Sequence, residues 1–148
     1  KFAPDNDITR AEYATIIARI LKLDTRRKFD GRFSDVKEDM WFYGYVYALS
    51  ELGIILGTPE NTFNPDQNIK REDMVVILMR TLKYINANTN VEGSHTFSDS
   101  ADISDYAKKA VETAAQLGII SGRDGNIFDP VGRATRAEAA KVLMALLR

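Results

Sequence analysis

Three segments of the chain carry apolar side chains at the same helical spacing. Residues at positions i, i+1 and i+5 lie on one stripe of an α-helix, so each segment predicts an amphipathic helix. The three sets are Ile16, Ile17 and Leu21; Ile77, Leu78 and Leu82; and Val142, Leu143 and Leu147. We expect helices over about 9–22, 70–84 and 135–147. Because no single helix can bury such a stripe alone, we expect the three to pack together.

The same motif precedes each of these helices. The segments FAPDNDITRAEY (2–13), FNPDQNIKREDM (63–74) and FDPVGRATRAEA (128–139) align at offsets of 61 and 65 residues. Further upstream, FSDV (33–36) matches FSDS (97–100), and LGIILG (52–57) matches LGIISG (117–122). The chain is therefore a tandem array. Its repeats occupy 1–24, 29–86 and 95–148, and we expect a fragment whose first repeat lacks its front half.

Each full repeat predicts one more helix before the shared motif, over about 39–52 and again over 104–117. Phe-Ser-Asp is expected to cap this helix, and Leu-Gly to end it, with Gly53 and Gly118 in the left-handed C′ position. Trp41 and Tyr106 take equivalent places within it. A loop rich in Gly, Pro and Asn leads to the next helix. The segments 24–31 and 86–96 read as connectors, and the fold class is mainly α.

Composition narrows the possible functions. The 148 residues are 45% hydrophobic and 28% charged, as in globular proteins, and the net charge is −1. No global field attracts nucleic acid, and no apolar run is long enough to span a bilayer. The chain has no cysteine and a single histidine, His95, which excludes thiolate and histidine-rich metal sites. We expect no metal and no cofactor.

The sequence Thr-Arg-Ala-Glu occurs at the start of the first and third shared helices. Thr-x-x-Glu before an apolar run is a capping box, which accounts for Thr9 with Glu12 and for Thr135 with Glu138. It does not account for the arginine, because a cation in the first turn meets the positive end of the helix dipole. The arginine recurs in register in all three repeats, as Arg10, Arg71 and Arg136, and this recurrence predicts an anionic partner. This partner is either a ligand or internal, for instance an Asp of Phe-Ser-Asp.

These motifs, in this order and spacing, resemble the S-layer homology domains of bacterial surface proteins. The resemblance covers nearly the whole chain. It implies three repeats arranged as a pseudo-threefold spindle around a central three-helix bundle. It also implies an extracellular module of the bacterial cell wall or S-layer. Such a module binds secondary cell-wall polysaccharide, often pyruvylated on N-acetylmannosamine, without a covalent link; peptidoglycan is a second candidate partner.

The resemblance also implies where a ligand lies. In that family it occupies grooves between repeats, where the arginine faces the glycine motif of the next repeat. Two grooves are expected to be complete here, and the predicted ligand-binding residues are Arg10 with Leu52, Gly53 and Gly57; Arg71 with Leu117, Gly118 and Gly122; and, in addition, Arg136, Asp35, Asp99 and Trp41. Trp41 is a candidate sugar-facing ring or a core aromatic. Gly53 and Gly118 are equally explained as helix caps.

The second repeat departs from the family pattern. It reads Lys70-Arg71-Glu72-Asp73, which loses the hydroxyl cap, keeps the arginine and adds a cation, so its groove is either altered or degenerate. The third repeat has Val131 where the others have Asp. Arg136 would need a glycine motif from the front half of the first repeat, so its groove is expected to be incomplete.

Three other classes of protein compete with this interpretation. An enzyme would need convergent groups, and the acids available for a glycosidase pair (Asp35, Glu38 and Asp39, or Asp99, Asp102 and Asp105) lie near helix starts, where acids usually cap. We therefore do not expect an enzyme. A calcium module is disfavoured because neither DNDITRAE nor DGNIFDP provides the ligand spacing of an EF-type loop. A structural helical repeat that mediates protein–protein interaction in a surface layer is the main alternative.

Overall fold

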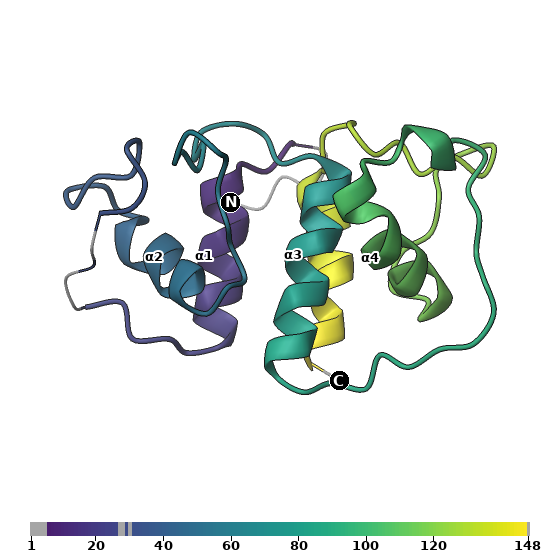
Figure 1. Ribbon diagram of the computed structural model, residues 1–148, viewed down its shortest axis with the longest axis horizontal. Coiled ribbons are helices and arrows are strands. Elements are labelled where there is room, and N and C mark those ends of the chain that lie inside the picture. Colours follow the sequence, from purple (N-terminus) through teal and green to yellow (C-terminus); the bar gives the residue numbers. More distant parts are fainter. Residues whose placement is uncertain (1–5, 27–28, 30, 148) are drawn as a thin grey trace. The chain divides into compact units, whose positions relative to one another are not determined.

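The fold is helical, as the sequence predicts. The computed structural model of the chain describes residues 6–26, 29 and 31–147 (Figure 1). The described residues form no β-strand, only isolated bridges between single residues. The elements, in chain order, are α1 (Arg10–Ile20), α2 (Tyr43–Glu51), α3 (Arg71–Tyr84), the 3₁₀ turn η1 (Ser100–Asp102), α4 (Asp105–Gln116), α5 (Arg136–Leu143) and the 3₁₀ turn η2 (Met144–Leu147).

The chain divides into two compact units. The first unit is Ile8–Asn68, and the second unit is Ile69–Arg148 together with Lys1–Asp7. The first unit therefore combines the back half of the first repeat with the front half of the second, and the second unit combines the back half of the second repeat with the whole third repeat. The junction between two repeats lies inside a unit, and we describe each unit by itself.

In the first unit α1 packs against α2 (Figure 1). Tyr13 and Ile17 of α1 and Leu49 of α2 are fully buried between them. An aromatic cluster extends this core to the loops that carry Phe33 and Phe63. The Phe33 ring centroid lies 5.3 Å from that of Tyr47 and 6.0 Å from that of Phe63. The Tyr47 hydroxyl also accepts the backbone N–H of Phe33 at 2.6 Å, which ties the Phe-Ser-Asp segment to α2.

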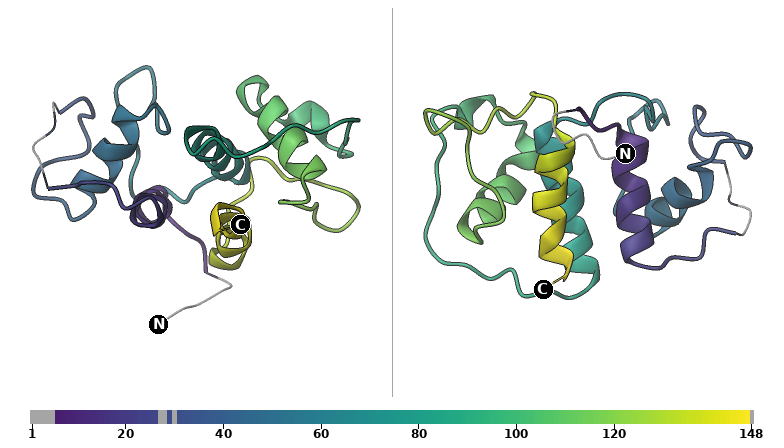
Figure 2. Two further views of the ribbon diagram at one scale, coloured as in Figure 1. Left: turned by 90° about the horizontal axis from the view of Figure 1, so that it is seen from below. Right: turned by 180° about the vertical axis from the view of Figure 1, so that it is seen from behind.

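In the second unit α3 packs against both α4 and α5, and Figure 2 shows α5 running alongside α3. Leu78, Val111 and Leu143 are buried between these helices. The predicted contact between the second and third shared helices is confirmed. Leu147 is an exception, because it lies in η2 and is exposed. The packing of α1 into a common three-helix bundle with α3 and α5, and the spindle itself, stay predictions.

The Phe-Ser-Asp segment does not cap a helix, so this prediction was wrong. The Asp35 carboxylate accepts the backbone N–H groups of Phe63 and Asn64 at 2.9 and 2.8 Å. Asp99 accepts those of Phe128 and Asp129, both at 2.9 Å. Each Asp thus holds the start of its own repeat's Phe-x-Pro loop, residues 63–68 or 128–133. With no cap at its predicted start, α2 begins only at Tyr43, later than expected.

Four glycines of the repeats fall into two kinds. Gly53 and Gly118 end α2 and α4 in the left-handed conformation, with φ of 75° and 74°, as predicted. A Cβ added to either would meet nothing within 4 Å. Gly57 also has positive φ, 76°, but its Cβ would collide with the Phe33 ring and lie 3.0 Å from the Thr62 carbonyl oxygen. A Cβ added to Gly122 would also be crowded, 3.1 Å from the Phe97 ring, but the φ of Gly122 is not positive.

We therefore expect Gly57→Ala to destabilise the protein more than Gly53→Ala. Both changes place a side chain at positive φ, which costs about 1–2 kcal/mol. Only Gly57→Ala also overfills a packed site, which adds about 1–3 kcal/mol. Urea unfolding followed by circular dichroism measures the difference. Equal losses in the two variants would show that Gly57 is needed only for its backbone conformation.

Candidate functional site

At each described junction, a helix of one repeat begins on the Phe-x-Pro loop of the next repeat. In the first unit the N–H of Arg10 donates to the Gln67 carbonyl at 2.9 Å, and the N–H of Ala11 to that of Pro65 at 3.0 Å. In the second unit Arg71 donates to Gly132 at 2.9 Å. The first N–H groups of a helix have no partner within it. Here the neighbouring repeat supplies the partner.

The start of α5, the third shared helix, makes the same contact with residues of the first repeat. The N–H of Arg136 donates to the Asn6 carbonyl at 2.8 Å, and Asp7 bridges to Thr135. Asn6 occupies the register position of Gln67 in the second repeat. An incomplete groove was expected at Arg136, and this contact was not predicted, although the aligned motif at residues 2–7 is the signal that could have identified it. Phe2 lies outside the described residues.

The arginine side chain explains why a cation stands at the start of these helices. Nε of Arg10 donates to the Phe63 carbonyl at 2.8 Å, and its guanidinium carbon lies 4.9 Å from the centroid of the Phe63 ring. Arg71 repeats both contacts on Phe128, at 2.7 and 5.1 Å. A carbonyl oxygen and a ring face both attract a guanidinium. The arginine therefore ties two repeats together whether or not a ligand binds.

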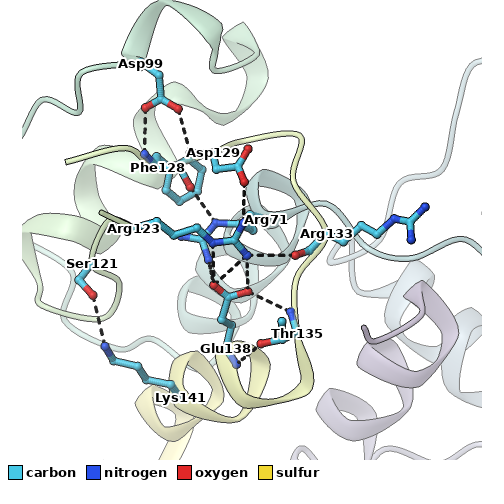
Figure 3. Close-up of polar contacts among 10 residues, drawn as sticks. All are labelled: Arg71, Asp99, Ser121, Arg123, Phe128, Asp129, Arg133, Thr135, Glu138 and Lys141. Carbon is cyan, nitrogen blue, oxygen red and sulfur yellow. Dashed lines mark hydrogen bonds and ion pairs between the residues drawn. The ribbon is translucent and has the colours of Figure 1, made fainter. Parts of the chain in front are cut away.

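Arg71 also has the internal anionic partner that the sequence left open. Its residue surface is only 4% exposed, and Nη1 bonds to Oε2 of Glu138 (Figure 3). Glu138 belongs to the capping box of α5, so the partner comes from that box rather than from Phe-Ser-Asp. Both predicted capping boxes are present, in α1 and in α5.

A second guanidinium, that of Arg123, contacts the same carboxylate, and Arg123 is not among the residues predicted from the sequence. Nη2 of Arg123 lies 3.0 and 3.1 Å from the two oxygens of Glu138. Its Nη1 lies 2.5 Å from Oδ2 of Asp129, and Nη2 also donates to the Arg133 carbonyl at 3.2 Å. Arg123 directly follows Gly122, where the second repeat has Thr58 after Gly57. This difference within the aligned motif is the signal that could have identified it.

The charged groups of this cluster shift one another's pKa values. Burial by itself would raise the pKa of Glu138, but the N–H of Thr135 and the guanidinium groups of Arg123 and Arg71 hold it below its ordinary value of 4.5. Burial lowers the pKa of Arg71, and Glu138 opposes that shift. Burial would also lower the pKa of Arg123, but Glu138 and Asp129 raise it overall. Glu138 is therefore ionised at neutral pH.

In the second repeat, the two acids of the Lys-Arg-Glu-Asp sequence bond to residues of the third repeat. Glu72, almost fully buried, accepts the N–H and the hydroxyl of Ser104 at 2.9 and 2.8 Å. Asp73 accepts the Tyr106 hydroxyl at 2.6 Å. Lys70 makes no side-chain cap, as expected. The acids of Lys-Arg-Glu-Asp therefore hold the start of α4 in the next repeat.

The contacts described for Arg10 and Arg71 lie on the Phe-x-Pro loops and, for Arg71, also on Glu138, not on the glycine motifs. Leu52 and Gly53 sit at the exposed end of α2, and Leu117 and Gly118 at the corresponding end of α4. Gly57 and Gly122 contact the phenylalanines of Phe-Ser-Asp. The pairing of each arginine with a glycine motif stays a prediction.

Trp41 is not a core residue. Its residue surface is 61% exposed, and its ring stands edge-on to Phe42 with centroids 5.4 Å apart. It lines an open hollow of about 600 Å³ together with Thr25, Arg26, Glu38, Asp39, Met40, Tyr43 and Gly44. Of the two roles expected for Trp41, the core aromatic is therefore wrong. An exposed indole beside polar groups is compatible with a sugar-facing role.

The residues that the structure describes provide neither a metal site nor a membrane span. There, no group of three or more His, Asp or Glu side chains is arranged to hold a metal ion. None of the described helices is both long and apolar enough to cross a membrane.

These features define a helical tandem-repeat protein whose repeats interlock through arginines. The family model for the S-layer homology domain matches residues 32–75 and 96–140, which together make up more than half of the chain. The chain belongs to this family. S-layer homology domains are anchoring modules of the bacterial cell surface that bind cell-wall components, and they are not themselves catalytic.

Named relatives include both enzymes and surface proteins. The chain is 40% identical over 149 residues to an amylopullulanase of Thermoanaerobacterium thermosulfurigenes and 39% identical over 149 residues to an exoglucanase of Acetivibrio thermocellus. It is 30% identical over 142 residues to an S-layer protein of Bacillus thuringiensis subsp. finitimus. These alignments cover 99%, 99% and 96% of this chain but only 8%, 13% and 17% of the relatives.

The depressed pKa of Glu138 predicts a pH dependence of stability. An acid whose folded pKa lies below its unfolded pKa stabilises the fold at any pH above the unfolded value, about 4.3. This contribution is lost as pH falls through the folded pKa. Wild type should therefore exceed Glu138→Gln in unfolding free energy by a constant margin from pH 7 to about pH 5, and the margin should shrink below about pH 4.

Urea unfolding of both proteins across this pH range measures the margin. The control is Glu12→Gln, the same change in the other capping box. It measures the stability lost when a capping carboxylate is removed where neither Arg71 nor Arg123 is its partner. A margin for Glu138 that stays constant down to pH 3 would contradict the ion-pair cluster.

Proposed function

We propose that this chain anchors its protein to the cell wall by binding secondary cell-wall polysaccharide at the junctions between repeats. The observation that supports the proposal is the recurrence of an arginine at each junction, in register, against the loop of the next repeat. Arg10 and Arg136 are half-buried, so part of each side chain stays within reach of a ligand in solution.

The chemistry of a pyruvylated polymer suits such a junction. A pyruvate ketal presents a carboxylate, and a planar guanidinium binds carboxylate through two parallel hydrogen bonds. Backbone N–H groups at a helix start favour the same charge. Glycines at the ends of α2 and α4 leave room for a sugar ring close to the backbone. The exposed Trp41 ring offers an apolar face to the C–H side of a sugar.

The polymer is tested with isolated cell walls. We expect the protein to sediment with intact sacculi and to stay in solution when the secondary polymer has been stripped from them. Equal retention on both kinds of wall would point to peptidoglycan as the partner. Retention on neither, together with binding to a purified surface-layer protein, would support the structural-repeat alternative.

The role of a junction arginine is tested at Arg10. Arg10→Ala removes a charge-assisted bidentate contact, which should cost about 1.5–3 kcal/mol, or tenfold or more in affinity for purified polymer. The matched control is Arg19→Ala on the same helix, because Arg19 is exposed and lies over the ring of Tyr45. Titration calorimetry gives the affinities, and circular dichroism checks the fold. Unchanged affinity of a folded Arg10→Ala protein would make this arginine purely structural.

A further inference from the structure

The junction in the second unit has a feature that bears on ligand binding. In the second unit the arginine of the junction is paired with a carboxylate of the protein itself. Glu138 receives Nη1 of Arg71, Nη2 of Arg123 at 3.0 and 3.1 Å, and the N–H of Thr135 at 2.9 Å (Figure 3). Two guanidinium groups and a helix-start N–H are the donors that an external carboxylate would also need.

We propose that Arg71 and Arg123 form a carboxylate site that Glu138 fills, so that an acidic sugar of the polymer enters only by displacing Glu138. The proposal deepens the proposed function and rests on it for the identity of the ligand. It assigns Arg123 as a second ligand-binding residue of this junction and Glu138 as an internal competitor.

Access to the site supports this order of events. The Arg71 side chain is 5% exposed and cannot be approached from solvent directly. Arg123 and Glu138, with side chains 38% and 26% exposed, form the open side of the cluster. A ligand carboxylate therefore meets Arg123 first, and it reaches Arg71 only where the Glu138 carboxylate now lies.

The charges lead to the same conclusion. Arg71 and Arg123 are balanced by Glu138 and Asp129, each of which bonds to at least one of them. A balanced cluster gains little from a further anion, because the new attraction to the arginines is offset by repulsion from the acids. Once Glu138 has left, two guanidinium groups face one remaining acid, and a carboxylate is then attracted.

Two residues of this cluster differ in the first unit. Thr58 stands at the register position of Arg123, and Asn64 at that of Asp129. The Thr58 hydroxyl is instead bonded to that of Thr62 at 2.7 Å. The pair of arginines is therefore a property of the junction between the second and third repeats.

The decisive variant is Glu138→Gln. Glutamine still serves in a capping box, so the start of α5 is kept while the competing charge is lost. The probe is the methyl glycoside of 4,6-pyruvylated N-acetylmannosamine, and binding is followed at the side-chain N–H signals of Arg71 and Arg123 by NMR. We expect the dissociation constant at these signals to fall about tenfold or more. Adding Arg123→Gln should abolish the gain.

The control is Glu12→Gln, which makes the same change in the capping box of α1 and should leave the Arg71 and Arg123 titrations unchanged. A measurement on the wild type guards against a variant that folds poorly. At saturating probe, the carboxyl ¹³C signal of Glu138 should shift as this side chain leaves the arginines. An unmoved Glu138 signal would overturn the inference, as would equal affinities of wild type and Glu138→Gln at this site.

The proposed function fails separately from this inference. If wild type does not bind purified polymer, the polysaccharide proposal is wrong, while the pyruvylated probe still decides whether Glu138 competes for a carboxylate. If wild type binds polymer but Glu138→Gln gains nothing at Arg71 and Arg123, the function stands and the inference is wrong.

Discussion

The structure depends on one contact, in which a helix begins on the loop of the next repeat. Its backbone part satisfies helix N–H groups that would otherwise lack partners, and it occurs at Arg10, Arg71 and Arg136. Its side-chain part places a guanidinium against the carbonyl and the ring of the phenylalanine that opens the loop, at Phe63 and Phe128. Each repeat thereby completes its neighbour, which explains why each compact unit combines parts of different repeats.

This contact gives the arginine two roles that are difficult to separate. A guanidinium has five N–H donors, so Nε can hold a carbonyl while the outer nitrogens remain available to an anion. In Arg71, Nη1 already bonds to Glu138. A junction arginine is therefore a structural tie in both units, and whether it also binds ligand depends on which acids lie near it.

Features set by local sequence could be predicted, and those set by distant neighbours could not. The helices, the capping boxes of Thr9 and Thr135 and the left-handed Gly53 and Gly118 all follow from spacings of a few residues. The targets of Asp35 and Asp99 and the partner of Arg71 depend on which loops meet. Glu138 was read correctly as a cap, and its second role appears only when Arg71 and Arg123, 67 and 15 residues away, converge on it.

The central claim is that Arg71 ties two repeats through a fork that a lysine cannot reproduce. The most direct measurement is the unfolding free energy of Arg71→Lys against that of Arg133→Lys, whose side chain is 71% exposed and pairs only loosely with Asp7 at 3.4 Å. Lysine keeps the charge but cannot bond to Phe128 and Glu138 together. The account predicts a loss of about 2 kcal/mol or more for Arg71→Lys and less than about 0.5 kcal/mol for Arg133→Lys. Equal stabilities of the two variants would contradict it.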